Sequence, residues 1–271
     1  MTVNPLAIAL AKAALIYDEE NARSKLESLG IKYSYWMPFA SGTDYFVVTI
    51  TADGFTDILF RGTKGKQAWA SNMNFTLDKK GLYHRDFYLS AMLAYSMMDE
   101  FYHFINQRGT ELMFKKVRAF CHSRSTGISP HLAIRLCEEL PACPESVELY
   151  NFAIAPTFTN RGITEVWVPA HNEYGISGFN VINSRDALCG ERFGPIKLRG
   201  TGEDDGADTT LNRIELPPDS AWQKVMKKLF PKFDSLPEHS PKEYADGLMV
   251  MYKDKPETVD FLKRARKLMV N

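Results

Sequence analysis

The chain has 271 residues, of which 45% are apolar and 24% are charged. This length is enough for one large α/β domain with a substantial core, and we expect residues 1–271 to form a single domain. The 33 Lys and Arg residues balance 33 Asp and Glu residues, so the formal net charge is zero. Binding to nucleic acid needs a basic surplus or a marked basic face, so the charge argues against nucleic acid as the main partner. The most basic stretch, residues 263–267, is predicted to be the solvated face of an amphipathic helix.

No targeting or membrane segment is readable in the sequence. The apolar run near the start has no basic region before it and acids directly after it, unlike a secretory signal. No uncharged apolar stretch is long enough to span a bilayer. The cysteines form no C-x-x-C pair and no metal-type spacing with histidine: they are Cys121, Cys137, Cys143 and Cys189. We therefore expect a cytoplasmic or otherwise soluble protein with reduced, mostly buried thiols.

The first predicted elements are a helix and a hairpin. Residues 6–29 have apolar positions at helical spacing, with Pro5 suited to the first turn and Gly30 to the end. Residues 44–63 predict two strands joined by a turn at Asp53–Gly54, the strongest short hairpin signal in the chain.

After the hairpin, helices and strands alternate. Short apolar runs predict buried strands, and longer amphipathic runs predict helices. Strands are expected at residues 117–122, 147–152 and 178–182, and helices at residues 86–107, 130–140, 222–230, 239–251 and 257–269. This alternation predicts an α/β fold with a mixed, mainly parallel sheet and helices on its faces. The acidic segment 200–210 could hold a calcium ion, but its spacing fits no EF-hand, and a solvated loop is favoured.

Residues 117–136 read as a strand that runs into a helix, with two serines at the junction. A nucleophile on such a turn needs small residues two positions before and after it. Ser125 has Ser123 and Gly127 at those positions, and it places Pro130 near the first helical turn. If Ser123 were the nucleophile, Pro130 would lie in the helix interior, where proline costs about 3 kcal/mol. The sequence favours Ser125 and leaves Ser123 as the alternative nucleophile; a serine-rich helix cap without catalysis also fits.

Residues 58–75 read ILFRGTKGKQAWASNMNF, a strand ending in F-R-G-T with a tryptophan, Trp69, and an asparagine, Asn72, beyond it. This block resembles the class 3 lipases, the fungal-type triacylglycerol lipase family. Further segments resemble that family in the same order, up to about residue 250: LYHRDFY (V-H-x-G-F), VRAFCHSRSTG (strand plus G-H-S-L-G), LYNFAIAPTFTN (Y-x-F-G-x-P-R-V-G-N), FNVINSRDALCG (aspartate segment) and EHSPKEYADGL (histidine segment).

The resemblance implies an α/β-hydrolase fold and a triad of Ser125, Asp186 and His239. The chain gives an independent check, because an α/β-hydrolase triad runs Ser…Asp…His. Of the six histidines, only His239 follows Asp186. Ser125 would attack an ester carbonyl, His239 would take its proton and Asp186 would orient the imidazole. By resemblance, the oxyanion hole is formed by Thr63 and by the backbone N–H of Thr126.

Two departures from the family pattern flank the predicted nucleophile. Ser123 stands in place of the glycine before it, and Ile128 replaces the second glycine after it. By resemblance, His84 would be structural. Arg61 is expected to hold the strand end rather than to touch substrate.

The segment after Thr63 corresponds to the family's short amphipathic lid. Trp69 is kept there as a lid and substrate residue, but Lys64, Lys66 and Gln67 make the segment polar and basic. A basic lid fits an anionic phospholipid surface or a soluble ester. The lysines could equally be the solvated residues of a loop.

These observations predict a serine hydrolase that cleaves carboxylic esters of lipids, lipase- or phospholipase-like, without cofactor or metal. The expected partners are a lipid or small ester substrate and a peripheral lipid surface, but no nucleic acid; the sequence does not give the oligomeric state. Two alternatives stay open. One is an esterase or thioesterase acting on a small soluble substrate, and the other is a catalytically silent hydrolase fold that binds.

Overall fold

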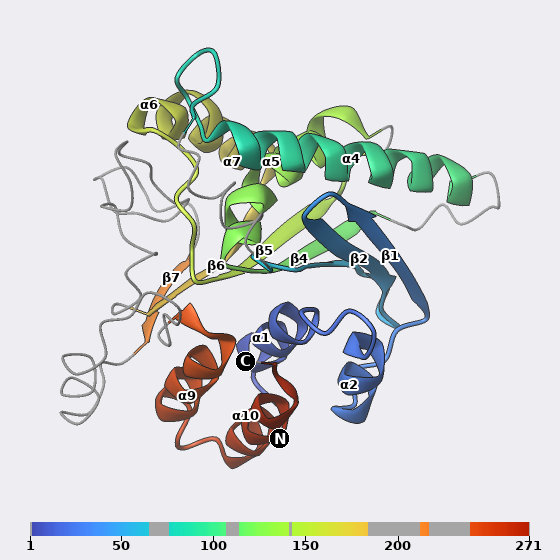
Figure 1. Cartoon of the computed structure of the whole chain (residues 1–271), viewed down its shortest axis with the longest axis vertical. Helices are drawn as coiled ribbons and strands as arrows, with labels where there is room; N and C mark the ends of the chain where they lie inside the picture. Colours follow the sequence, from blue (N-terminus) through green and yellow to red (C-terminus); the bar gives the residue numbers. More distant parts are fainter. Residues whose placement is uncertain are drawn as a thin grey trace.

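The structure, a computed structural model, describes residues 2–64, 76–106, 114–140, 143–183, 212–216 and 239–270. Several sequence predictions lie outside the described residues: Trp69, Asp186, Cys189, the acidic segment 200–210 and the helix expected at 222–230. The described part is built on one sheet whose seven strands follow one another in chain order (Figure 1).

The sheet is mixed and mainly parallel, as predicted. Its antiparallel part contains β1 (Tyr35–Ser41), β2 (Asp44–Ile50) and β3 (Thr56–Phe60). Parallel pairing then links β3 to β4 (Lys116–His122), β5 (Ser146–Phe152), β6 (Ser177–Asn183) and β7 (Asn212–Leu216). The turn between β2 and β3 contains Gly54 at φ +81°, which confirms the predicted hairpin. Strands β1 and β7 were not predicted.

Helices cover both faces of the sheet (Figure 1). One face carries α4 (Arg85–Asn106), α5 (Arg124–Glu139), α6 (Asn160–Gly162), the π-helical turn η1 (Ile163–Trp167) and α7 (Val168–Tyr174). Because each parallel strand is added on the same side of the one before it, right-handed crossovers place these helices together. The other face is covered by α1 (Pro5–Leu15), α2 (Ala22–Ser28), α9 (Pro241–Met251) and α10 (Pro256–Leu268). This arrangement is an α/β-hydrolase fold, as predicted.

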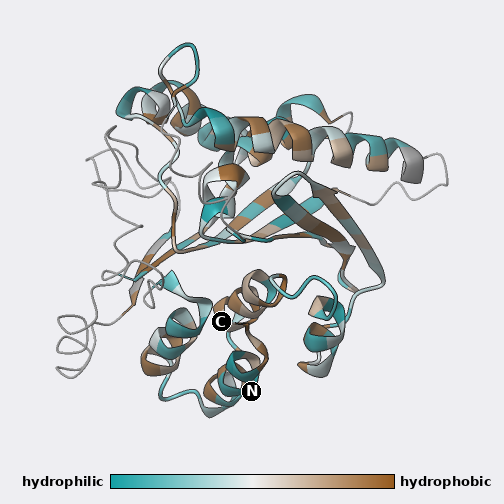
Figure 2. Ribbon diagram, in the orientation of Figure 1, coloured by the Kyte–Doolittle hydropathy of each residue, from teal (hydrophilic) through white to brown (hydrophobic). Residues whose placement is uncertain are grey.

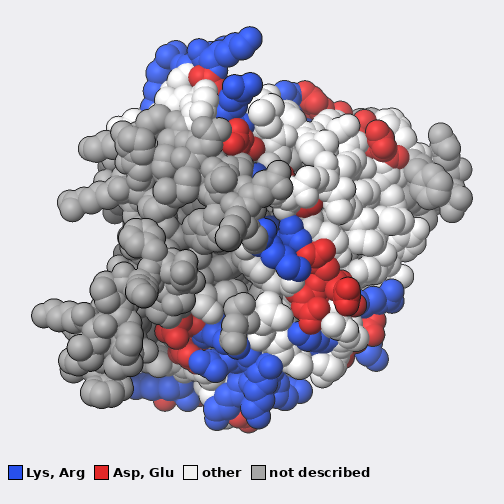
Figure 3. All heavy atoms as spheres, in the orientation of Figure 1, with Lys and Arg blue, Asp and Glu red and all other residues white. Residues whose placement is uncertain are grey.

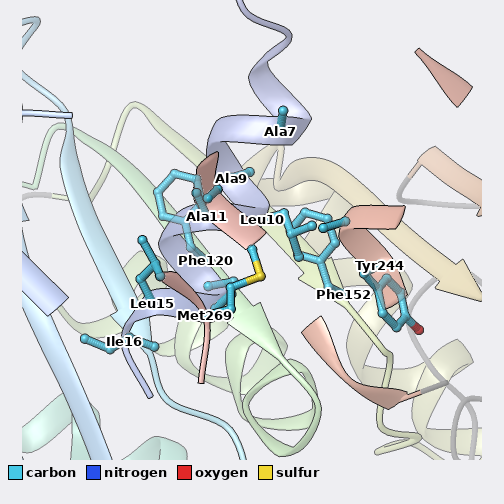
Figure 4. Packing of buried hydrophobic residues seen from close by; sticks show 14 of the residues in the cluster. Ala7, Ala9, Leu10, Ala11, Leu15, Ile16, Phe120, Phe152, Tyr244 and Met269 are labelled. Atoms are coloured by element: carbon cyan, nitrogen blue, oxygen red, sulfur yellow. The ribbon is translucent and has the colours of Figure 1, made fainter. Parts of the chain in front are cut away.

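The N-terminal segment forms two helices rather than the single predicted helix 6–29. Helix α1 is almost fully buried, because it lies between the sheet and the C-terminal helices, and it is largely apolar in Figure 2. Its Leu10 and Leu15 share a core with Phe120 and Phe152 from the sheet and Tyr244 from α9 (Figure 4). Helix α1 near the start of the sequence and helices α9 and α10 near its end therefore pack together in one layer.

Helix α10 has the predicted amphipathic character. Its buried side is formed by Thr258, Phe261, Leu262 and Ala265, whereas Lys263, Arg264 and Lys267 are exposed. Basic side chains gather along the lower edge of Figure 3, where α9 and α10 lie in Figure 1. None of the described helices is both long and apolar enough to cross a membrane. Cys121 and Cys137 are buried free thiols, and Cys143 is an exposed one.

A buried ionic cluster joins α1 to the sheet. The Asp57 carboxylate has no solvent exposure and contacts Lys12 Nζ through one oxygen. Its other oxygen accepts a hydrogen bond of 2.8 Å from Arg118 Nε. Burial lowers the pKa of Lys12, and the neighbouring Asp57 opposes that shift. The Asp57 carboxylate on β3 thus pairs with Lys12 from α1 and with Arg118 from β4. These contacts fix α1 against the two strands.

We predict that Asp57→Asn lowers the free energy of unfolding by about 3–5 kcal/mol, because it leaves buried Lys12 without its counter-charge and Arg118 with only the exposed Asp53, 3.9 Å away. Lys12→Met is the matched control, since Asp57 keeps Arg118 and the methionine fills the same space; its loss is expected to be clearly smaller. Urea denaturation measures both values. Equal losses for the two variants would contradict this account of the cluster.

His131 on α5 is buried in a largely aromatic cluster. Its Nε2 lies 3.0 Å from Thr157 Oγ1, and its ring lies 4.9 Å from Tyr83 and 4.6 Å from Phe158 between ring centroids. Burial lowers the pKa of His131 from 6.5 to about 3, and the nearby His84 adds to the shift. The folded protein therefore holds this imidazole in its neutral form.

His131 should make the protein less stable in acid. Between pH 6.5 and about 3 the unfolded chain binds a proton that the folded His131 does not, so stability falls as the pH falls. The expected slope from this residue is up to about 1.4 kcal/mol per pH unit. Denaturant unfolding of wild type and His131→Gln between about pH 4 and 7 isolates the slope. Equal slopes for the two proteins would show that His131 is not the titrating group.

Candidate active site

The turn between β4 and α5 holds Ser123 in an uncommon backbone conformation. Ser123 has φ +61° and ψ −129°, a region that side-chain-bearing residues rarely adopt. Its N–H donates to the carbonyl of Phe152 on β5 at 2.9 Å, and its own carbonyl accepts from Thr126 N at 2.9 Å. A strained residue between a strand's carboxyl end and a helix is the position of the nucleophile in α/β-hydrolases.

His239 lies against this serine. Its Nε2 is 2.6 Å from Ser123 Oγ, although the two residues are 116 positions apart in the chain. His239 directly precedes α9, whose N-cap Ser240 accepts a hydrogen bond from Lys242 N. Tyr244 on the same helix is fully buried and accepts a hydrogen bond of 3.2 Å from Asn183 N, at the end of β6. Helix α9 thus holds the histidine at the carboxyl edge of the sheet.

Ser125, the nucleophile favoured by the sequence, does not face His239; the serine whose hydroxyl lies against His239 is Ser123, the alternative nucleophile. The Ser125 side chain is fully buried. Its Oγ accepts from His122 N at 3.0 Å and lies within hydrogen-bond distance of the His122 carbonyl, also at 3.0 Å. Ser125 therefore supports the turn from inside. The small residues that flank the turn are Cys121 and Ser125, and burial raises the pKa of the Cys121 thiol to about 12.

Pro130 does not lie near the start of the helix, as the sequence argument for Ser125 assumed. Helix α5 begins at Arg124 rather than at Pro130, so the proline lies inside the helix. It cannot donate to the carbonyl of Thr126, the residue four positions earlier. The Ser129 hydroxyl lies 3.4 Å from that carbonyl oxygen, but it donates its proton to the nearer Asn151 Oδ1 at 3.0 Å. Ile128, which replaces a glycine of the family pattern, packs in the core between helix and sheet.

Of the two predicted oxyanion residues, Thr126 lies within the turn itself and Thr63 lies just after the end of the neighbouring strand. Thr126 is part of the turn: its N–H donates to the Ser123 carbonyl, and its hydroxyl accepts from Ala155 N at 2.7 Å. With Ser123 on the strained turn, the residue directly after it is Arg124. Thr63 follows Gly62, which approaches the turn so closely that a Cβ there would lie 2.3 Å from the His122 carbonyl oxygen. Thr63 is therefore next to the segment that carries Ser123.

Tyr17 connects these two strand ends and was missed by the sequence analysis. Its hydroxyl lies 2.9 Å from His122 Nδ1 and packs so close to Gly62 that a Cβ there would lie 2.0 Å from it. Burial raises the pKa of Tyr17 well above its usual range, so the phenol stays protonated. The residue lies in the break between α1 and α2, where no periodic pattern or motif marks it.

Arg61 holds the end of β3, as expected from the sequence. Its guanidinium pairs with Glu19 and donates to the Thr43 carbonyl at 2.6 Å. Lys64 also bonds to Glu19, at 2.9 Å, so the described lysine of the predicted lid is bound to a carboxylate. His84 is buried and stacks on Phe87 with ring centroids 4.1 Å apart, in keeping with a structural role. The described residues contain no cluster of His, Cys, Asp and Glu suited to a metal ion.

Comparison with known proteins gives a distant match in structure. No protein-family model matches the sequence, and no curated protein matches it. Among solved structures, the chain is similar to a triacylglycerol lipase from Penicillium expansum, with 11% sequence identity and a TM-score of 0.41. The match covers 74% of this chain and 80% of the lipase. A likeness this distant assigns no activity, which has to be argued from the side chains.

We predict that Ser125→Ala is destabilising without disturbing the Ser123–His239 pair. The substitution leaves the buried N–H of His122 without its acceptor, which costs about 1–3 kcal/mol. Ser129→Ala is the comparison on the next turn of the same helix, because it removes a buried donor to Asn151 Oδ1 and not the acceptor of the His122 N–H. Chemical denaturation gives both values. A Ser125→Ala protein as stable as wild type would contradict the supporting role of this hydroxyl.

Proposed function

We propose that the protein is a serine hydrolase that cleaves carboxylic esters, with Ser123 as nucleophile and His239 as general base. The observation that carries the proposal is the 2.6 Å contact between His239 Nε2 and Ser123 Oγ at a strained strand–helix turn. A serine hydroxyl is a weak nucleophile unless a base within hydrogen-bond distance takes its proton. The left-handed conformation of Ser123 supports the proposal further, because strain of this kind gathers at functional sites.

The chemistry follows in two steps. Ser123 Oγ attacks the ester carbonyl while His239 takes the hydroxyl proton, and the same proton then goes to the departing alcohol. Water, activated by His239, attacks the resulting acyl-enzyme, which releases the carboxylic acid and restores Ser123. Asp186 is proposed, by family resemblance, as the carboxylate that orients His239. It follows β6 by three residues in the sequence.

The oxyanion of the tetrahedral intermediate needs preorganised donors. In hydrolases of this fold one donor is the backbone N–H of the residue after the nucleophile, and the other comes from the loop after an earlier strand. With Ser123 as nucleophile, the first donor is the N–H of Arg124 instead of the expected N–H of Thr126. Thr63, after β3, keeps its expected role. A backbone N–H in the first turn of a helix has no acceptor within the helix, which suits it to this purpose.

The proposed substrate class is a carboxylic ester with an acyl chain, as in lipids. The family resemblance of the F-R-G-T block and the ordered motifs around the serine and histidine support this choice. We also propose that the protein binds at a lipid surface when it acts on such esters.

A fluorophosphonate probe tests the proposed function, because it reacts only with an activated serine. We expect the probe to label wild type at Ser123. Ser123→Ala should abolish labelling, and His239→Ala should slow it at least about 1000-fold, the scale on which a triad acts as a unit. Ser125→Ala should keep labelling if it stays folded, and circular dichroism checks the fold. Peptide mass spectrometry locates the adduct.

Three outcomes would contradict the proposal in different ways. An adduct on Ser125 would restore the nucleophile expected from the sequence. Labelling at Ser123 with turnover of short soluble esters and none of lipid esters would support a small-ester esterase instead. An unlabelled, folded wild type would indicate a silent hydrolase fold.

A further inference from the structure

Arg124 follows Ser123, and its long side chain is buried rather than exposed. Only 4% of it is accessible to solvent. The guanidinium reaches Asp44 on β2, where Nε donates to Oδ1 at 3.2 Å. It also lies over the ring of Phe87 on α4, with Cζ 5.3 Å from the ring centroid. A charged side chain at the first position of α5 is therefore anchored to two other elements.

Ser90 on α4 completes a closed set of hydrogen bonds with this pair. Arg124 Nη2 donates to Ser90 Oγ at 2.9 Å, and Ser90 Oγ donates to Asp44 Oδ2 at 2.6 Å. Both oxygens of the Asp44 carboxylate thus accept a hydrogen bond. A buried charge pair that is also hydrogen-bonded in this way holds one geometry, whereas an isolated pair can move.

The start of β2 also contacts the strand end that leads to Thr63. Arg61 donates its backbone N–H to the Tyr45 carbonyl at 3.0 Å and its Nη2 to the Thr43 carbonyl at 2.6 Å. Asp44 lies between these two acceptors in the chain. The three residues 43–45 are therefore bonded both to Arg124 and to Arg61, two positions before Thr63.

We propose that Asp44 is a positioning residue that fixes the distance between the two oxyanion donors by holding the Arg124 side chain. The inference rests on the proposed function, in which the backbone N–H groups of Thr63 and Arg124 bind the oxyanion. Such donors act within 2.7–3.1 Å of the oxyanion, roughly a hydrogen-bond length. Misplacement by about 1 Å can cost about 100-fold in rate. The Asp44 anchor limits movement of the Arg124 side chain and hence of its main chain, and the neighbouring carbonyls of Thr43 and Tyr45 hold Arg61, two positions before Thr63.

The main variant is Asp44→Asn, which keeps the shape of the side chain and removes its charge. We expect kcat on p-nitrophenyl butyrate to fall about 10- to 100-fold, with KM within about twofold, because the donors act on the transition state. The rate of phosphonate labelling at Ser123 should fall in parallel, since the phosphonyl oxygen occupies the same hole. All rates are normalised to titrated active sites, so partial unfolding does not imitate the effect.

Two further proteins make the test specific. Arg124→Met removes the guanidinium and retains the stem, and the double variant Asp44→Asn/Arg124→Met should be no slower than the slower single variant. The control is Glu165→Gln, which removes the charge of the Arg161–Glu165 pair between α6 and η1. That pair has no part in positioning Ser123, His239 or the oxyanion donors, so we expect kcat to stay as in wild type.

The failure of this inference differs from the failure of the proposed function. An unlabelled wild type overturns both. A labelled wild type with an Asp44→Asn variant of unchanged kcat overturns the positioning role alone. Losses in the double variant that multiply would show that Asp44 and Arg124 act separately, which also overturns it.

Discussion

The left-handed turn at Ser123 is the constraint on which the rest of the site depends. A residue with a side chain adopts this conformation only when its surroundings impose it, since the strain is worth about 1–3 kcal/mol. Two glycines make room for those surroundings. A Cβ at Gly62 would lie 2.3 Å from the His122 carbonyl oxygen, and one at Gly127 would lie 2.4 Å from Phe87 Cδ2. The end of β3 and helix α4 therefore approach the turn from two sides, and neither approach would tolerate even alanine without a shift.

The polar residues around Ser123 are explained by the same constraint. A sharp turn leaves main-chain groups without the partners that a regular strand or helix would supply. Ser125 Oγ accepts from the His122 N–H, the Thr126 hydroxyl links the Ser123 carbonyl to Ala155 N, and Ser129 donates to Asn151 Oδ1 on β5. The serine-rich sequence after β4 is thus mostly structural. One serine of the group, Ser123, has its hydroxyl against a histidine from a distant part of the chain.

The sequence predicted the features that depend on neighbouring residues better than those that depend on contacts between distant parts of the chain. Apolar runs predicted β4, β5 and β6, and Gly54 predicted the hairpin, because burial of a strand and the geometry of a turn depend on residues that are adjacent in the sequence. Strand β1 was not predicted because it is an edge strand that contains Pro38, and proline normally argues against a strand.

For the candidate site, the chain order of a hydrolase triad selected His239, and the structure places its imidazole next to the hydroxyl of Ser123. The sequence favoured Ser125 through local proline and glycine rules. In the structure Pro130 lies buried inside α5, and His239 lies against Ser123 rather than Ser125. Tyr17 and Asp44 could not be found from the sequence, because their partners are distant in the chain and no motif marks them. Tyr17 contacts His122, 105 positions away, and Asp44 bonds to Ser90 and Arg124, 46 and 80 positions away.

The position of His239 shows that the site is assembled from both faces of the sheet. Ser123 belongs to the connection that enters α5 on one face, whereas His239 precedes α9 on the other. Helix α9 is held by Tyr244, which packs against Phe152 and binds the end of β6, and α9 in turn lies on α1. The buried Lys12–Asp57–Arg118 cluster fixes α1 to β3 and β4, the strands that lead to Thr63 and to Ser123. His239 and Ser123 are therefore both positioned by elements that pack on α1. A substitution that weakens the packing of α1 should increase the distance between the two side chains, although it contacts neither of them.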